Sequence, residues 1–300
     1  MWLIMSKVYD CFTFYNEFDL LDLRLNVLDQ VVDYFVIVES TKTFTGKDKP
    51  LYFKDNIDRY QKFQNKIRHV VVRDGDYEYT DCAWQMEFNQ RNAIQKGLYD
   101  CSKEDFVIIS DVDEIINPRS IEKAIKYNSE SISFFRQKCY YYYLNCLSAE
   151  VFLKAKIVKY KYMKSPQELR DYPKYNSHNK TGFYRLILKW KGSIRKKISR
   201  IFNTYVIQNN GGWHFTYMNS SKGIQDKISA FAHTEFNLDE FSSIDNINSR
   251  KENFIDPFDR GYDMRIVQID RTFPDYLIEN LDKYEHMIYA KNSHQKIDEQ

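Results

Sequence analysis

The chain has 300 residues, of which 43% are hydrophobic and 29% are charged, and its formal net charge is +2. These proportions are typical of a folded domain, and the near-neutral net charge argues against a nucleic-acid partner. The five cysteines contain no C-x-x-C pair, which argues against a zinc site and favours reduced thiols.

No segment of the sequence predicts a membrane span. The apolar run at residues 1–5 is far too short for a span or for the hydrophobic part of a signal peptide, and no later run approaches a spanning length. We therefore expect a soluble, cytoplasmic protein. The basic run from Arg195 to Arg200 is typical of a solvated face, with peripheral contact to an anionic membrane as the alternative.

Strands and helices are predicted to alternate over the first third of the chain. Apolar, β-rich runs predict four strands, at residues 8–14, 34–38, 67–72 and 106–109. Helical periodicity predicts one helix capped by Asn16, with Asp19 three positions later, and another at residues 84–98. This alternation is typical of an α/β fold with a mostly parallel central sheet flanked by helices.

Two acidic residues fall where predicted strands end. Glu39 follows the strand at residues 34–38, and Asp111 follows the strand at residues 106–109. Because ligands of parallel sheets bind beyond the carboxyl ends of the strands, we expect both side chains to face a ligand site.

The pattern changes after about residue 120, where strands follow one another with fewer helices between them. Further elements are predicted as strands at residues 132–138, 151–162, 182–190 and 213–217, a polar loop at 164–180 and a helix at 223–231. The prediction is therefore one continuous domain with a donor-binding half, residues 1–120, and an acceptor-binding half, residues 121–300, that ends in a helical segment.

The run Asp111-Val-Asp-Glu114 carries the sharpest chemical signal in the chain. Asp111 and Asp113 are two apart at the end of a buried strand, so their carboxylates are expected to reach one small volume. Mg²⁺ and Mn²⁺ bind readily through one or two carboxylates together with substrate phosphates. A solvated loop is the competing interpretation of an Asp-x-Asp tripeptide, and the preceding strand and the following Glu114 favour a metal site.

A second candidate region contains the paired glycines before Trp213 and His214. Glycines let a backbone approach a ligand closely, and the His214 imidazole is able to complete a metal shell. Arg91, on the predicted helix before the Asp111 strand, is suited to clamp a diphosphate. A structural histidine and a surface arginine are the competing interpretations.

Two further features bear on an acceptor. Glu235, which follows the predicted helix at 223–231, is a candidate general base toward a hydroxyl group. The four tyrosines at residues 140–143 are suited to stacking on sugars where they are exposed, although packing alone also explains them.

Several motifs of other enzyme classes are absent. The sequence contains no G-x-G-x-x-G, Walker A, G-x-S-x-G or H-E-x-x-H, which removes the usual support for dinucleotide oxidoreductases, P-loop kinases, α/β-hydrolases and zincins.

Taken together, these motifs resemble those of glycosyltransferase family 17 from about Tyr9 to about Phe236. The matching segments are Asn16-Glu-Phe-Asp-Leu-Leu-Asp-Leu-Arg-Leu25, Val32-Asp-Tyr-Phe-Val-Ile-Val-Glu-Ser40, Thr45-Gly46, Pro50-Leu51, Asp111-Val-Asp-Glu-Ile115 and Gly212-Trp-His214. The resemblance implies a GT-A type fold, UDP-GlcNAc as the donor, a divalent metal and inversion at the anomeric carbon.

The resulting hypothesis is a metal-dependent inverting transfer of a sugar, with GlcNAc expected, from a UDP-sugar donor to a glycan acceptor. Asp111, Asp113 and His214 are assigned to Mn²⁺ or Mg²⁺, and Glu235, with Glu114 as the alternative, to proton removal from the acceptor. The donor-binding residues are expected to be Glu17, Asp19, Glu39, Arg91, Asp111 and Trp213. A sugar nucleotidyltransferase and a catalytically inactive glycan-binding protein are the alternatives.

Overall fold

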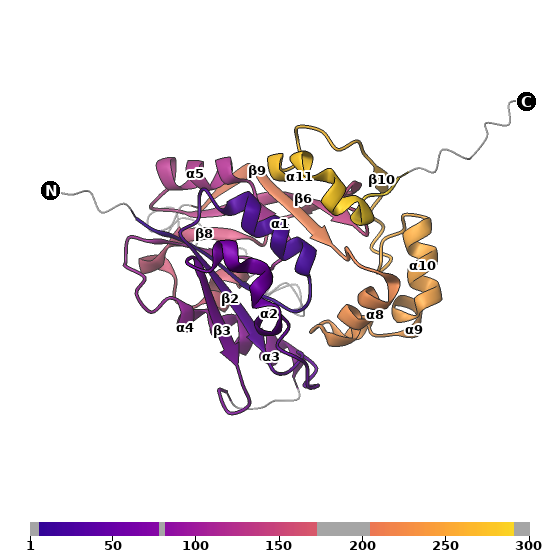
Figure 1. The fold of residues 1–300 in the computed structure, drawn as a ribbon, viewed down its shortest axis with the longest axis horizontal. Helices are drawn as coiled ribbons and strands as arrows, with labels where there is room; N and C mark the ends of the chain where they lie inside the picture. The colour runs from indigo at the N-terminus through magenta and orange to yellow at the C-terminus, as the bar shows by residue number, and fades with distance from the viewer. Residues whose placement is uncertain (1–5, 78–81, 173–204, 291–300) are drawn as a thin grey trace, which may run out of the picture.

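A computed structural model describes residues 6–77, 82–172 and 205–290 of the chain. Within these residues one ten-stranded sheet runs through the molecule, and helices cover it (Figure 1). The main strand order is β10-β7-β6-β8-β4-β1-β2-β3, and β9 joins β6 to the short strand β5. The strands are β1 Val8–Thr13, β2 Tyr34–Ser40, β3 Ile67–Val72, β4 Phe106–Ile109, β5 Glu114–Ile116, β6 Ile132–Tyr141, β7 Cys146–Phe152, β8 Lys156–Lys159, β9 Tyr205–Thr216 and β10 Met264–Ile266.

The prediction of a parallel sheet is confirmed for its β3-β2-β1-β4 part, where every neighbouring pair is parallel. Residue alternation along β1 explains the two covered faces. Phe12 packs in a core with Leu21 and Leu25 of helix α1, whereas Cys11 packs on the other face with Ile94 and Leu98. The carboxyl ends of these four strands therefore meet at one edge of the sheet.

The remaining part of the sheet is mixed. Strand β8 is antiparallel to β4 and β6, and β7 and β10 continue the antiparallel order, whereas β9 lies parallel to β6 and antiparallel to β5. The predicted strand at residues 151–162 is wrong, because β7 ends at Phe152 and a separate strand, β8, begins at Lys156. The strand predicted at residues 213–217 is longer, since β9 begins at Tyr205.

The helices also depart from the prediction in detail. Glu17, not Asn16, precedes the first residue of α1, and Asp19 in the first turn pairs with His286. The helix predicted at residues 84–98 is two helices, and the predicted loop at 164–180 contains α6. The helices are α1 Phe18–Leu28, α2 Tyr52–Asp55, η1 Ile57–Phe63, α3 Ala83–Asn92, α4 Ile94–Gly97, α5 Pro118–Tyr127, η2 Tyr160–Tyr162, α6 Pro166–Asp171, α8 Ser221–Ala230, η3 Thr234–Phe236, α9 Asp239–Ser242, α10 Ile244–Glu252, α11 Asp275–Glu279 and η4 Leu281–Met287.

The C-terminal elements form two groups of helices that pack on different parts of the molecule. The α11–η4 segment packs against α1, as the yellow and indigo helices of Figure 1 show, and shares a core with Leu20 and Leu23. Helices α8 and α10 pack on each other beside the end of β9. Among the described residues no helix combines the length and the apolar character that crossing a bilayer requires. The predicted strand at 182–190 and the basic run Arg195 to Arg200 lie outside the described residues.

Candidate functional site

The loop between β4 and β5 carries Asp111 and Asp113, and a fully buried arginine holds this loop in place. Arg24 of α1 pairs with the equally buried Asp10 of β1 at 2.6 Å. The remaining guanidinium hydrogens point at the loop, where Arg24 donates to the carbonyl oxygens of Asp111 at 2.7 Å and Glu114 at 3.0 Å. Since a buried guanidinium needs all of its donors paired, the path of the loop is strongly constrained.

Asp111 is held by two arginines. Its carboxylate oxygens lie 3.0 Å from Arg91 of α3 and 2.6 Å from Arg170 of α6. Burial favours the neutral acid, but the charges of Arg170 and Arg91 outweigh this and hold the pKa of Asp111 well below its usual range. Asp111 is therefore ionised at any physiological pH, and both of its oxygens already have cationic partners.

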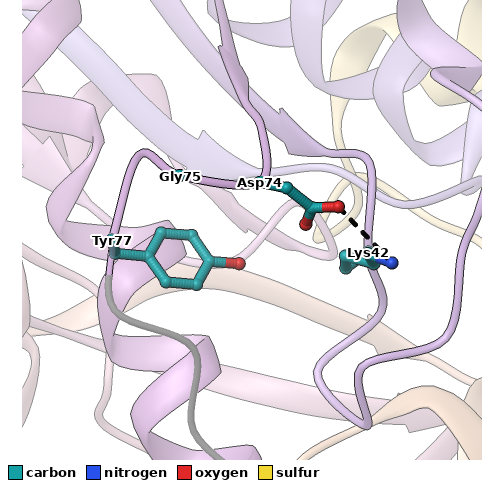
Figure 2. A pocket seen from close by; sticks show the side chains of 4 residues that line it. All are labelled: Lys42, Asp74, Gly75 and Tyr77. Carbon is teal, nitrogen blue, oxygen red and sulfur yellow. Dashed lines mark ion pairs between the residues drawn. The ribbon is translucent and has the colours of Figure 1, made fainter.

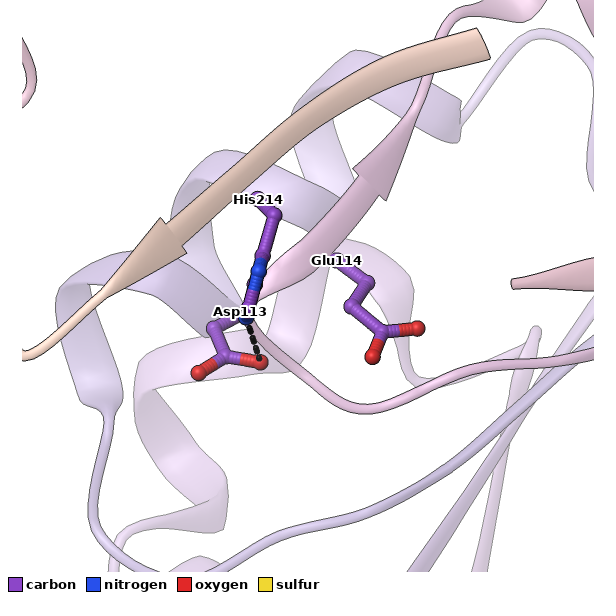
Figure 3. Close-up of side chains that lie close together, drawn as sticks. All are labelled: Asp113, Glu114 and His214. Atoms are coloured by element: carbon purple, nitrogen blue, oxygen red, sulfur yellow. Dashed lines mark ion pairs between the residues drawn. The ribbon is translucent and has the colours of Figure 1, made fainter. Parts of the chain in front are cut away.

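Asp113 faces a different group of side chains. Asp113, Glu114 and His214 each offer one ligand atom, and these atoms lie within 4.8 Å of one another. The antiparallel pairing of β5 with β9 sets Glu114 opposite His214. In Figure 3 the imidazole comes from β9 and a dashed line joins it to Asp113, with Glu114 beside them; Asp113 Oδ1 lies 3.6 Å from His214 Nε2.

The surroundings of His214 orient its ring. Its Nδ1 lies 3.7 Å from the buried Cys139 thiol, and its ring centroid lies 4.1 Å from that of Phe152. These contacts leave Nε2 turned toward Asp113. A neutral imidazole in this orientation offers a lone pair to the same volume as the carboxylate.

Cations from remote segments surround the acidic side chains. Arg170 binds both oxygens of Glu114, at 2.5 and 2.7 Å, and Lys227 of α8 lies 3.0 Å from Asp113 Oδ2. Burial disfavours the charge of Lys227, but Asp113 and Glu17 outweigh this and raise its pKa above the usual range. The lysine is therefore an ammonium ion.

The cluster nevertheless carries excess negative charge. Its direct ion pairs join five carboxylates to three cations: Glu17, Glu87, Asp111, Asp113 and Glu114 to Arg91, Arg170 and Lys227. In these direct pairs the carboxylates outnumber their lysine and arginine partners by two. This excess of negative charge suits a divalent cation, for which carboxylate oxygens and an imidazole nitrogen are suitable ligands. Asp113 and His214 are the ligands best placed to hold it, because Asp111 and Glu114 are engaged by arginines.

Several residues assigned to the donor from the sequence lie elsewhere. Glu39 is fully buried and accepts hydrogen bonds from the backbone of Phe53 and Lys54 at the start of α2. Trp213 is buried in the core, where its indole donates to the carbonyl of Thr272. Asp19 is 3.0 Å from His286. The structure therefore does not bring these three side chains into the cluster around Asp113.

The remaining candidates from the sequence differ in their surroundings. Arg91 is buried and turned toward Asp111, with Glu87 as its second ionic partner. Glu235 is exposed on η3 and lies 2.7 Å from His233, whose ring packs on Trp84 at the start of α3. Of the four tyrosines at 140–143, the first three are buried, so packing explains them. Stacking on a sugar stays open only for Tyr143, which is partly exposed.

Arg170 and Lys227 were missed by sequence reasoning. Ser165 before Pro166 is a helix-start signal, and in the structure Ser165 caps α6 through the backbone of Glu168. That signal was available and predicts the helix that carries Arg170. The pairing of Arg170 with residues 56 and 59 positions away depends on the tertiary fold.

Two pockets open near the carboxyl edge of the parallel strands. The first, of about 270 Å³, is lined by Lys42, Asp74, Gly75 and Tyr77, and Figure 2 shows the ring of Tyr77 facing the Lys42–Asp74 ion pair. The second is small, about 20 Å³, and adjoins the acidic cluster. Its lining residues are Asn16, Glu17, Leu20, Tyr217, Met218, Asn219, Gly223, Ile224 and Lys227.

Known proteins share part of this sequence. Over 118 residues, 37% of this chain, it is 30% identical to proteins named β-1,4-mannosyl-glycoprotein 4-β-N-acetylglucosaminyltransferase from Rattus norvegicus and Homo sapiens. The match covers 22% of those proteins, so this chain spans only about a fifth of the length of the relatives that it matches.

The chain also resembles a solved structure and matches the profile of a protein family. The alignment with the crystal structure of HddC from Yersinia pseudotuberculosis covers 60% of this chain and 83% of the HddC chain, with 14% sequence identity. Its TM-score of 0.31 is too low to support a conclusion about the fold. The profile of glycosyltransferase family 17 matches residues 2–173, a segment that contains the β4–β5 loop and Arg170. Because the profile covers more than half of the sequence, the chain belongs to glycosyltransferase family 17.

Proposed function

We propose that this chain is a metal-dependent, inverting glycosyltransferase of the GT-A type. It transfers a sugar, with UDP-GlcNAc as the expected donor, to a hydroxyl group of a glycan. Membership of the family and the names of the relatives support the reaction class and the GlcNAc group. The observation that carries the metal dependence is the approach of Asp113 to His214, 3.6 Å apart in a cluster with excess negative charge.

Asp113 and His214 would hold the divalent cation, with Glu114 close enough to join them. When bound, the cation neutralises the charge that develops on the departing nucleoside diphosphate. Arg91 and Arg170 hold the side chain of Asp111, and Arg170 also holds that of Glu114. Arg24 holds the backbone that carries all three acidic residues. This chain thus presents preorganised negative charge on a backbone that Arg24 holds, so the acidic side chains themselves need little rearrangement when the cation binds.

Glu235 is the proposed general base toward the acceptor hydroxyl. Burial favours its neutral form, but the hydrogen bond from His233 outweighs this and holds the pKa of Glu235 below its usual range, so it is ionised at neutral pH. The contact of His233 with Trp84 links η3 to α3, the helix that also carries Arg91. Glu114 is less suited as the base, because Arg170 occupies both of its oxygens.

A donor screen with a single-residue variant tests this function. UDP-, GDP- and CMP-sugars are incubated with the protein in Mn²⁺ or EDTA, and release of the nucleoside diphosphate or monophosphate is measured. We expect turnover of UDP-GlcNAc in Mn²⁺ and none in EDTA. Asp113→Asn should lower this turnover by about 100-fold or more, because a ligand contributes at least as much as the residues that support it.

The matched control is Asp282→Asn, which removes an exposed carboxylate on η4. It should leave turnover unchanged, and both variants should unfold at the wild-type midpoint. Equal turnover in EDTA would overturn the metal dependence. If the wild type turns over no donor, and wild type and Asp113→Asn bind glycans equally well, the protein would instead be a glycan-binding protein. Formation of UDP-sugar from UTP and a sugar phosphate would indicate a nucleotidyltransferase.

A further inference from the structure

Lys227 is the one residue of α8 whose charge reaches the acidic cluster among the described contacts. Its Nζ bridges two carboxylates, 3.0 Å from Asp113 and 3.2 Å from Glu17. Glu17 follows β1 and Asp113 precedes β5, so the ammonium joins three segments that are remote in sequence. The ammonium therefore supplies positive charge to two carboxylates that have little access to solvent.

The three cations of the cluster differ in their access to solvent. The side chains of Arg91 and Arg170 are 4% and 9% exposed, and each lies between two carboxylates. The side chain of Lys227 is 25% exposed, and it lines the small second pocket together with Glu17 and Tyr217. Of these three, Lys227 is therefore the cation that an anionic ligand entering from solvent meets.

A divalent cation on Asp113 would compete with this ammonium. Both need the lone pairs of the same carboxylate, and two positive charges at contact distance repel each other. Lysine has a flexible four-carbon stem and is a point charge, so its head group is able to move by several ångströms without moving the helix. The arginines have no such freedom, because their planar groups are held on two sides.

The pocket beside Lys227 contains a strained residue. Tyr217, directly after β9, has a φ of +58°, a conformation that a tyrosine rarely adopts, and its ring centroid lies 5.7 Å from Lys227 Nζ. Strain of this kind persists where the surrounding structure holds a side chain in a required place. Here it sets an aromatic ring beside the Lys227 ammonium, in the pocket that both residues line.

We propose that Lys227 is an exchangeable cation, which neutralises Asp113 while the metal is absent and pairs with the diphosphate of the donor once a divalent metal has taken its place. This proposal rests on the function proposed above. It requires that the metal and the nucleotide bind with positive coupling, since each favours the released position of the same side chain.

Metal titrations test the proposal without relying on turnover. Binding of Mn²⁺ to the full chain is measured calorimetrically or from the free Mn²⁺ signal, with and without UDP. Compared with wild type, Lys227→Met should bind Mn²⁺ about tenfold more tightly in the absence of UDP, because the competing charge is gone. In wild type, UDP should tighten Mn²⁺ binding about fivefold or more. In Lys227→Met this tightening should be smaller, because only the direct attraction between the metal and the diphosphate is left.

Two further variants separate exchange from general effects. Lys222→Met removes a lysine of the same helix that pairs with Asp226 and is 65% exposed, and it should behave as wild type. Lys227→Arg keeps the charge and should retain most of the coupling. Unchanged or weaker Mn²⁺ binding by Lys227→Met would overturn the proposal, while Mn²⁺-dependent turnover by the wild type would leave the proposed function standing. A wild type that binds no Mn²⁺ would overturn both.

Discussion

At the scale of single residues, neighbouring carboxylates of the β4–β5 loop have different environments. Asp111 and Glu114 face arginines, whereas Asp113 faces His214 and an exchangeable lysine. A buried carboxylate with two guanidinium partners is strongly ionised but has few lone pairs left for a metal. The preference for Asp113 as a ligand thus follows from the charges near each oxygen and not from the acidic motif itself.

Glu39 has a structural role, which a pH series tests. Its side chain accepts two backbone hydrogen bonds at 2.9 and 3.0 Å and lies 2.7 Å from His69. Burial raises the pKa of Glu39, but these partners outweigh it and lower the pKa below the usual 4.5. Glu39→Gln should therefore lower the free energy of unfolding by about 1–3 kcal/mol at pH 7.

The difference between wild type and Glu39→Gln should shrink with acidification. A carboxyl group whose pKa is lowered by folding stabilises the protein above its unfolded pKa and loses this contribution as the pH falls through the folded value. Urea unfolding between pH 7 and pH 4 measures the difference, which should decrease below about pH 4.5. A variant of wild-type stability that binds UDP more weakly would instead return Glu39 to the donor site.

At the scale of elements, strand β9 lies between β5 and β6 because of its paired glycines. The sequence suggested that they let the backbone approach a ligand, but they allow close approach to neighbouring strands. A Cβ on Gly211 would overlap the backbone of Phe135 and Arg136, and one on Gly212 would overlap the carbonyl oxygen of Ile115. This tight packing sets His214 opposite Glu114.

Gly212→Ala should therefore disturb both the sheet and the metal site. Gly212 has a φ of +125° and no room for a side chain, so we expect a loss of about 2–4 kcal/mol in the free energy of unfolding and weaker Mn²⁺ binding. Gly261→Ala is the control, because Gly261 has a φ of +78° but open space around it. It should cost about 1–2 kcal/mol and leave Mn²⁺ binding unchanged. Equal effects on both measurements would contradict this account of β9.

At the scale of the whole molecule, the C-terminal segment is part of the same core as the site. Leu277 of α11 is fully buried in a cluster with Leu20 of α1 and with Ile115 and Trp213, which belong to the strands that carry Glu114 and His214. Lys283 and Tyr284 of η4 contact Asp22 of α1 as well. One continuous domain stays a prediction, and this packing suggests a mutation that tests it.

Leu277→Ala should accordingly destabilise the entire chain. Truncating a fully buried leucine costs about 2–5 kcal/mol, whereas Leu281→Ala, at a position that is 37% exposed, should cost about 1 kcal/mol or less. Circular dichroism and tryptophan fluorescence should report one common unfolding transition, shifted to the same lower midpoint in Leu277→Ala. Two separated transitions, of which only one moves, would show that the C-terminal half folds by itself.

The sequence by itself determined the local parts of this protein. Runs of apolar residues predicted β1 to β4 within about two residues, because alternation and burial leave a pattern in adjacent positions. The same logic placed the acidic loop at the carboxyl edge of the parallel strands, and the combined motifs indicated the family. It failed where a break depends on contacts elsewhere, as between β7 and β8, and at α6, where a capping signal was overlooked.

The tertiary structure alone decided the partner of each charge. Arg170 reaches Asp111 across 59 positions, and Lys227 reaches Asp113 across 114. The tertiary structure also buries Glu39 and Trp213 away from the cluster. The sequence had suggested both for the donor site, Glu39 because it follows a predicted strand and Trp213 because it follows the paired glycines. Secondary structure is encoded by near neighbours, but a Coulombic contact depends on how the sheet and helices bring distant residues together, and no local pattern specifies that arrangement.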